Sequence, residues 1–404
     1  MASTPLTLAA LATSAVPGLQ VFGSRLHTDG GEGEYTSAVL STDDGELIVR
    51  VPRNSAAEVR QSAEMLGLSA LAEGARSALP FRVSEIRGLT RAGDTRAVVS
   101  TFLAGGRIEA QDLEGEALLL QPLAEALAAI HRLPVTMVQQ AGLTSRSADD
   151  VRQEASRLVG RAADTRLLPE VVHSRWLEAL ESKRLWDFSP TVVHGSLDAD
   201  RLLIEDDRIV GVLGWGELSV GDPAVDLAWL FAAGHEVLDA VLARYIAERG
   251  TGGSTELRAR TRFHHELEVA RWLLHGVETH DSAVVDDAVA MLDRLVDRFT
   301  RLGQPVPERP AATPDEVERL LDEVPEAPVD PRSETAEYEA LDEDRVFAID
   351  NDFTDADFAG DDGEDAASGG NAVTGDDRDT GGRGAAVDGE DPAPESDSGP
   401  RNSG

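Results

Sequence analysis

The segment from Thr191 to Leu230 constrains the fold more than any other part of the chain. An apolar pair leads into a loop at His194–Gly195, and the pattern that follows predicts a short β-hairpin over residues 202–213. A turn at Gly221–Pro223 then precedes a run of apolar residues that is typical of a buried helix. These elements together indicate a cluster of polar loops held on an apolar core.

The rest of the first 304 residues divides into a strand-rich part and a helical part. Runs rich in β-branched residues predict strands over residues 46–51, 81–88 and 96–103. Helical spacing predicts a helix capped by Asn54 or Ser55 that continues to about Glu73, with an apolar face of Val59, Ala63, Leu66 and Ala70. From Glu114 the pattern becomes helical, through Leu118, Leu119, Leu123, Leu127 and Ile130. A small strand-rich lobe before a larger helical lobe indicates a two-lobed α+β fold.

Acidic residues are concentrated at the C-terminal end. The chain has 74 acidic and 37 basic residues, a formal charge of −37, and residues 305–404 alone contribute −23 with few large apolar side chains. Such a segment cannot offset the entropy of ordering, so we expect a disordered acidic tail, with one capped amphipathic pattern predicting a short helix at 314–324. The expected organisation is a strand-rich lobe with an N-terminal helix at 1–103, a helical lobe at 104–304 and the tail at 305–404.

The composition also excludes several classes of function. The chain has no cysteine, which excludes a thiolate metal site and a cysteine nucleophile and is typical of a cytoplasmic protein. A strongly acidic chain disfavours nucleic acid and anionic membranes as partners. The apolar stretch at 6–16 is shorter than the roughly 20 residues that a membrane span needs. We therefore expect a soluble protein whose first helix is amphipathic or docked on the core.

Four elements in a fixed order carry a resemblance to a known family. They are the motif at Ala129–Pro134, the loop Val193–Gly195, the hairpin after it, and the segment Gly221–Ala228 with its two aspartates. Over roughly residues 17–300 the chain resembles the aminoglycoside/macrolide phosphotransferases, which share the protein-kinase-like fold. The resemblance implies a small-molecule kinase that uses ATP or GTP with Mg²⁺.

The sequence departs from the family's pattern where the chemistry takes place. Two residues after the loop histidine, His194, the family has an Asp that orients and deprotonates the substrate hydroxyl, and this chain has Ser196. The family's metal-binding Asn and Asp are replaced by Arg201 and Gly214. Serine cannot take a proton near neutral pH, glycine offers no ligand, and arginine puts a cation where the metal belongs. These changes imply a pseudo-phosphotransferase that acts as a binding or regulatory module.

Two alternatives remain open at the catalytic loop. Asp198, Asp200 and Glu217 lie in the same loops and could act as displaced metal ligands, which would keep an active ATP- or GTP-dependent phosphotransferase with Mg²⁺. Alternatively, Arg201 could hold a phosphate directly and permit nucleotide binding without a metal.

The strand-rich lobe has two candidate nucleotide-binding residues. Arg50 lies where the family places the basic residue that holds the nucleotide phosphates, and Glu64 is the candidate helix carboxylate to pair with it. The glycines at 30–33 resemble a phosphate-covering loop in position. Because acidic residues surround them and repel phosphate, a flexible turn is the favoured interpretation.

Other polar and aromatic residues have structural interpretations. Asp222 is expected to form a turn and Asp226 to cap the following helix. A helix over 261–276 is expected to carry solvated or capping histidines on its flanks and just beyond its end, namely His264, His265, His275 and His280. The core of the helical lobe is expected to contain Trp176, Trp186, Trp229 and Trp272.

The acidic tail leaves the partner open. Its alternation of acidic and apolar residues suits a segment that folds on a protein partner or on its own helical lobe. A purely solubilising tail and an acidic mimic of nucleic acid are the alternatives. A small-molecule ligand is compatible with every one of these hypotheses, and the sequence does not identify it.

Overall fold

The computed structural model describes residues 5–27, 33–250 and 254–302. The chain divides into two units, residues 1–360 and 361–404, and the fold below is that of the first. The predicted acidic tail at 305–404, its helix at 314–324, and Gly30 and Gly31 lie outside the described residues. Within the described ranges, no helix is both long enough and apolar enough to cross a membrane.

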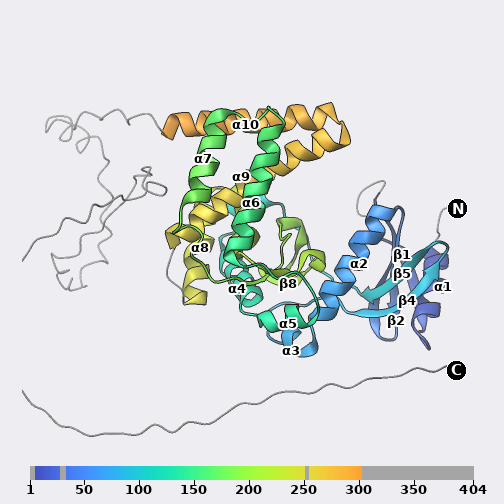
Figure 1. The fold of residues 1–404 in the computed structure, drawn as a ribbon. Helices are drawn as coiled ribbons and strands as arrows, with labels where there is room; N and C mark the ends of the chain where they lie inside the picture. The colour runs from blue at the N-terminus through green and yellow to red at the C-terminus, as the bar shows by residue number, and fades with distance from the viewer. Residues whose placement is uncertain (1–4, 28–32, 251–253, 303–404) are drawn as a thin grey trace, which may run out of the picture. The chain divides into compact units, whose positions relative to one another are not determined.

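The strand-rich lobe is a five-stranded antiparallel sheet. Its strand order is β1-β2-β3-β5-β4, with bounds β1 (Val21–Leu26), β2 (Tyr35–Thr42), β3 (Gly45–Pro52), β4 (Ile86–Ala92) and β5 (Thr95–Thr101). The first helix, α1 (Pro5–Ala15), lies against this sheet (Figure 1), and its fully buried Leu8 and Ala12 join an apolar cluster with Leu40 and Val49. The strand-rich lobe and the core-docked first helix expected from the sequence are therefore confirmed.

Helix α2 (Ser55–Ala70) buries a different face from the one expected. Asn54 caps it as predicted, by accepting from the Ala57 N–H at 2.8 Å. Val59 and Leu66, however, are 69% and 57% exposed. The apolar face assigned from the sequence is therefore wrong for these two residues.

The buried side of α2 contains polar residues that have partners. Gln61 donates to the Arg96 backbone carbonyl at 3.1 Å, and Glu64 accepts from Arg50 on β3 at 2.9 Å. Because a hydrogen-bonded polar group can be buried at lower cost than an unpaired one, these contacts and the buried apolar residues Ala57 and Leu68 together set which side of α2 faces inward.

A glycine lets α2 approach the helical lobe closely. At Gly67 an added Cβ would overlap the backbone carbonyl oxygen of Trp215, in the short 3₁₀ helix η4 (Trp215–Glu217). The loop that carries Gly214 and Trp215 is thereby packed directly against the helix that carries Glu64.

The segment expected as a strand over residues 81–88 is mostly a crossing between the lobes. Strand β4 begins only at Ile86. Before it, the Arg82 backbone donates to Val210 (3.0 Å) and accepts from Val212 (3.2 Å) in the hairpin of the other lobe. Phe81 and Val83 are buried on either side, so their apolar character reflects this crossing.

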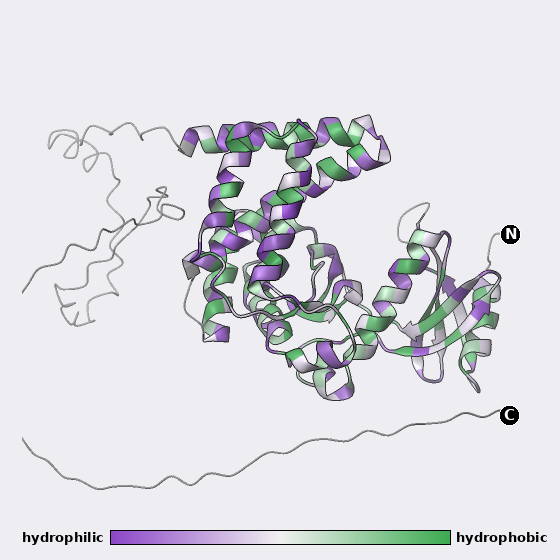
Figure 2. Cartoon of the chain, in the orientation of Figure 1, coloured by the Kyte–Doolittle hydropathy of each residue, from purple (hydrophilic) through white to green (hydrophobic). Residues whose placement is uncertain are grey.

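The helical lobe contains the predicted hairpin and a set of long helices. The short strands are β6 (Thr191–Val193) paired with β9 (Ser219–Gly221), and β7 (Leu202–Glu205) paired with β8 (Arg208–Val212). The helices are α3 (Glu73–Arg76), α4 (Leu120–His131), α5 (Val135–Gln140), α6 (Ala148–Asp164), α7 (Glu170–Glu181), α8 (His235–Arg249), α9 (Ser254–Thr279) and α10 (Ser282–Leu302). Figure 2 shows hydrophobic and hydrophilic residues alternating along α6 and α10, as expected of amphipathic helices.

Two apolar clusters hold this lobe together. One lies around α4 and α8 beneath the short strands, and the other lies among α6, α7, α9 and α10. Trp176, Trp186 and Trp229 are buried as expected. Trp272 is 39% exposed and donates to Asp287 at 2.9 Å, so its expected place in the core is wrong.

The close approach at Gly67 can be tested by adding one methyl group. We expect Gly67→Ala to lower the free energy of unfolding by about 1–3 kcal/mol, because the Cβ would push α2 away from Trp215. Gly160→Ala is the matched control, since Gly160 is exposed within α6 and nothing lies near its Cβ position. It should stabilise by about 0.5–1 kcal/mol through helix propensity. Urea unfolding measures both, and stabilisation by Gly67→Ala would contradict the packing.

Glu266 on α9 provides a test by pH. Burial raises the pKa of its carboxyl, although Trp176 donates to Oε2 at 3.0 Å, and Oε1 has no partner among the described atoms. Because the pKa of Glu266 is higher in the folded state, its contribution to the free energy of unfolding is fully present below the usual pKa of 4.5. This contribution is lost as the pH rises through the folded-state pKa. Glu266→Gln should therefore remove this loss and raise the Tm at pH 8 relative to wild type. Glu268 is exposed on the same helix. Glu268→Gln should therefore leave the dependence of the Tm on pH unchanged.

Candidate functional site

Asp226 organises the loop that carries His194. It is fully buried inside the 3₁₀ helix η5 (Pro223–Ala233). It accepts hydrogen bonds from the backbone N–H groups of His194 (2.7 Å) and Gly195 (2.8 Å). Its Oδ2 also lies 3.0 Å from Nε2 of His131. The carboxylate therefore fixes the backbone of this loop from below.

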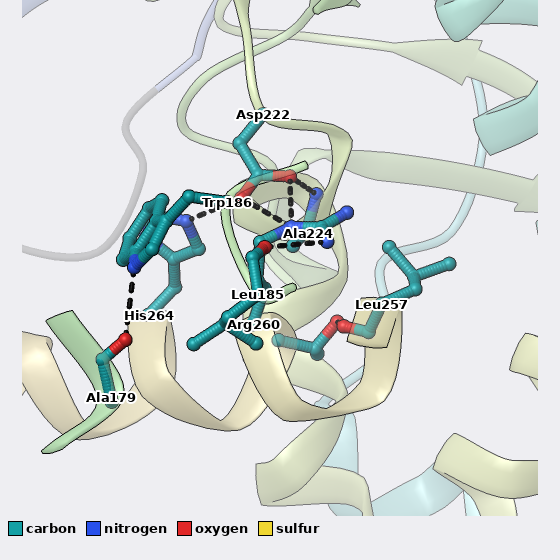
Figure 3. Close-up of polar contacts among 9 residues, drawn as sticks. Ala179, Leu185, Trp186, Asp222, Ala224, Leu257, Arg260 and His264 are labelled. Carbon is teal, nitrogen blue, oxygen red and sulfur yellow. Dashed lines mark hydrogen bonds and ion pairs between the residues drawn. The ribbon is translucent and has the colours of Figure 1, made fainter. Parts of the chain in front are cut away.

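The helix cap expected at Asp226 is supplied by Asp222 instead. Oδ1 of Asp222 accepts from the Ala224 N–H at 3.0 Å. Arg260 Nε donates to both carboxylate oxygens at 3.1 and 2.9 Å, and His264 Nε2 lies 3.0 Å from Oδ2 (Figure 3). His264 is only 4% exposed. Its expected solvated position is therefore wrong, because it belongs to a buried ionic cluster.

The other histidines of this region differ from one another. His265 stacks on Phe231 at 5.0 Å between ring centroids, and burial lowers its pKa, so a solvated position is wrong for it as well. His275 and His280 are exposed, as expected.

The two buried aspartates are held in their charged form. Burial by itself raises the pKa of a carboxyl group because the charged form loses its hydration. Here hydrogen bonds from the neighbouring histidines and backbone, and the positive charges nearby, outweigh burial. The pKa values of Asp222 and Asp226 therefore lie below the usual 3.8.

His194 joins this loop to the one that carries Gly214. Its Nε2–H donates to the Leu213 backbone carbonyl at 2.9 Å, and its ring lies against Trp215 with centroids 4.7 Å apart. Burial lowers the pKa of His194, so the ring is neutral. It acts as a fixed donor between the two loops.

Arg201 occupies the space beside Gly214. The residue lies in the short 3₁₀ helix η3 (Ala199–Arg201). Gly214 has a left-handed φ of +83°, and a Cβ there would lie 3.0 Å from Cδ and 3.3 Å from Nε and NH1 of Arg201. Ser196 lies across the same space, with its Oγ 3.4 Å from the Gly214 carbonyl oxygen. Ser196, Arg201 and Gly214 therefore lie together at one point.

The residues at this point do not fit a magnesium ion. Gly214 has no donor atom, and the guanidinium beside it is a cation. Asp200 is paired with Arg201 Nε at 3.3 Å, and Asp198 accepts from the Ala199 backbone N–H at 2.6 Å. Among the described residues, no group of three or more His, Asp or Glu side chains could hold a metal ion, so Asp198, Asp200 and Glu217 do not form a shared ligand set.

A cavity of about 620 Å³ lies above the loop. It is lined by Arg50 and Glu64 from the strand-rich lobe and by Arg201 and Gly214 from the helical lobe. Apolar side chains also line it, namely Ile48, Leu103, Leu203 and Leu213. Glu64 pairs with Arg50 as expected.

A second cavity of about 960 Å³ lies on the other side of the loop. Ser196, Arg201 and Glu217 line both cavities. The remaining lining comes largely from α6, η5 and α9 and carries both signs of charge, with Arg146, Arg157, Arg161 and Arg271 beside Glu154 and Glu268. The two cavities therefore share the residues of this loop as a common wall.

The phosphotransferase enzyme family model matches residues 28–264 of this chain. The chain belongs to this family. The matched region contains the Arg50–Glu64 pair, the His194 loop and both buried aspartates, so the resemblance seen in the sequence is confirmed.

The chain is also similar to individual proteins over most of their length. Viomycin phosphotransferase from Streptomyces vinaceus is 29% identical over 252 residues, which cover 58% of this chain and 81% of that protein. The uncharacterized protein YcbJ from Bacillus subtilis is 24% identical over 247 residues, covering 56% and 78%. The crystal structure of a macrolide 2'-phosphotransferase from Brachybacterium faecium matches with a TM-score of 0.59 at 22% identity, covering 72% of this chain and 98% of that one.

Sequence reasoning missed several members of the buried networks. His131 also lies 2.8 Å from the Tyr245 hydroxyl, 114 residues away. Arg260 and His264 reach Asp222 across 38 and 42 residues. His131 lies within the family-like motif at 129–134, which was the available signal. Tyr245, Arg260 and His264 belong to no local sequence pattern, because the residues that they contact are distant in the sequence.

The role of Asp226 can be measured by stability. We expect Asp226→Asn to lower the free energy of unfolding by about 3 kcal/mol or more, because it removes a buried charged acceptor from two backbone N–H groups and a histidine. Asp286→Asn, at an exposed position of α10, should change stability by about 0.5 kcal/mol or less.

The pH dependence of the same variant checks the mechanism. Because the folded-state pKa of Asp226 is lowered, its stabilisation is present above the usual 3.8 and is lost as the pH falls through the folded-state value. The difference between wild type and Asp226→Asn should therefore shrink below about pH 4. A difference that stays constant from pH 7 to pH 3 would contradict this assignment.

Proposed function

We propose that this protein is a pseudo-phosphotransferase: a family member that has lost metal-dependent phosphoryl transfer and works as a binding or regulatory module. The observation that carries the proposal is the position of Arg201 beside Gly214. Its side chain fills the space into which an Asp at position 214 would extend, within 3.0–3.3 Å of the ideal Cβ.

The chemistry of the loop supports this proposal. Phosphoryl transfer relies on positioning and on metal ions that neutralise the developing negative charge. Ser196 has no basic group to take the substrate proton, Gly214 has no ligand atom, and the Arg201 guanidinium repels a divalent cation. Each of these three residues alone would lower the rate of phosphoryl transfer. Together they leave the loop with neither a general base nor a metal-binding site.

The alternative of an active enzyme with displaced ligands has less support. It requires Asp198, Asp200 and Glu217 to converge on one point. Asp198 and Asp200 are instead engaged with Ala199 and Arg201, and no such group occurs among the described residues.

The scaffold for ligand binding is intact. The Arg50–Glu64 pair and the apolar walls of the 620 Å³ cavity suit a nucleotide. The second cavity carries arginine as well as carboxylate side chains. Its lining has five arginine and six carboxylate side chains, and this nearly even balance suits a neutral or zwitterionic small molecule.

The proposal predicts that the lost function can be recovered in steps. Wild type should show no Mg²⁺-dependent turnover of ATP or GTP, and Mg²⁺ should not increase stabilisation by either nucleotide. The triple variant Ser196→Asp, Arg201→Asn, Gly214→Asp should gain Mg²⁺-dependent stabilisation, with a Tm rise of about 5–10 °C at nucleotide 100-fold above Kd. The measurements are thermal shift with and without Mg²⁺ and a phosphate-release assay.

Single variants separate metal binding from other effects. Gly214→Asp alone should gain nothing, because its carboxylate would pair with Arg201. Gly142→Asp is a control for strain, since Gly142 also has a positive φ, +69°, but has open space around it. Mg²⁺-dependent turnover by wild type that disappears in Glu217→Gln would overturn the proposal in favour of the active enzyme.

A further inference from the structure

Arg201 makes contacts through both its backbone and the stem of its side chain. Its backbone N–H donates to Asp198 at 3.0 Å, and its backbone carbonyl accepts from the Leu213 N–H at 2.9 Å. Its Nε pairs with Asp200 at 3.3 Å, and its Cδ and Nε pack against Gly214. The two backbone hydrogen bonds fix the main chain of Arg201, and the contacts with Asp200 and Gly214 restrict the stem of its side chain before a ligand binds.

The end of the same side chain is open to the cavity. The side chain is 44% exposed. Asp200 engages Nε, and the structure shows no hydrogen bond from the terminal nitrogens to any described residue. Guanidinium groups bind phosphate oxygens through two parallel N–H donors. Arg201 is therefore positioned to offer such a fork to a ligand.

Arg50 lines the same cavity from the opposite lobe. It is held by Glu64 at 2.9 Å and keeps a 25% exposed side chain. Between the two arginines the cavity has the apolar walls described above. The ligand that matches these features has a flat or apolar part and an anionic part, as a nucleoside phosphate does.

The charge balance favours a ligand without a metal ion. A single guanidinium carries half the charge of Mg²⁺. The cavity lining has four arginines and four carboxylates, namely Arg50, Arg60, Arg107 and Arg201 with Glu34, Glu64, Asp200 and Glu217, so it has no excess of positive charge. This suits the lower charge of a nucleoside mono- or diphosphate better than that of a triphosphate.

We propose, building on the loss of metal-dependent transfer above, that Arg201 takes the place of the metal and binds the phosphate of a nucleoside mono- or diphosphate directly, together with Arg50. The cavity then works as a metal-independent nucleotide sensor. No covalent step is involved.

Direct binding measurements test this proposal. The full chain is titrated with fluorescently labelled ADP and GDP, in EDTA and in Mg²⁺, and binding is followed by anisotropy. Wild type should bind in EDTA, and Mg²⁺ should change Kd by less than about twofold. Arg201→Gln should weaken binding by about 10- to 100-fold, whereas Arg201→Lys, which keeps the charge but loses the fork, should be intermediate.

Controls identify the phosphate contact. Arg208→Gln, at an exposed position of β8 outside the cavity lining, should bind like wild type. Unlabelled adenosine, competing with the labelled nucleotide, should bind equally to wild type and Arg201→Gln, because it has no phosphate. Far-ultraviolet circular dichroism and the Tm of each variant exclude unfolding as the cause.

The outcomes separate this inference from the proposed function. No binding in EDTA at millimolar nucleotide, an equal Kd for Arg201→Gln and wild type, or binding that Mg²⁺ strengthens more than tenfold would each overturn the inference. If those results came with no turnover, the proposed function would still stand. Metal-free binding that depends on Arg201, found together with turnover, would support the inference and overturn the proposed function.

Discussion

The buried carboxylate of Asp226 is the interaction on which the functional region depends. It accepts two backbone N–H groups from the loop at His194 and Gly195 and lies in contact with His131. A carboxylate that is buried away from water is stable in its charged form only when its oxygens accept hydrogen bonds from the protein. The loop must therefore keep one conformation, and the cavities on both sides of it are shaped as a consequence.

A second layer of contacts extends this rigidity to the neighbouring loop. His194 donates to Leu213 and packs on Trp215, and Gly67 lets helix α2 press on the same segment. Arg50 and Glu64 are thus held relative to Arg201 through a continuous series of packed groups. None of these contacts is made by the side chain of Ser196 or Arg201 or by Gly214. This independence explains physically how the scaffold can remain while the reactive groups change.

Residues that differ from the family's pattern also fit one another. Glycine at 214 leaves room for the Arg201 side chain, and the guanidinium in turn fills the space that a carboxylate would have used. An arginine there beside an intact metal-binding aspartate would form an internal ion pair and block both roles.

Local patterns in the sequence were sufficient for the family and for some of the elements, although strands β1 and β2 were not predicted. The hairpin at 202–213, the Asn54 cap and the Arg50–Glu64 pairing were all predictable, because each depends on short-range spacing or on a motif. The inward face of α2 and the burial of His264 were not predictable, because they depend on polar partners far away in the chain.

The sequence by itself determined the two-lobed fold, the position of the loop and the residue types at 196 and 214, which are serine and glycine. Only the tertiary structure decided which aspartate holds the loop and where the guanidinium of Arg201 lies. The physical reason is that composition and periodicity report which residue types are available. Hydrogen bonds and charge contacts depend on distances between residues that the folded chain alone brings together.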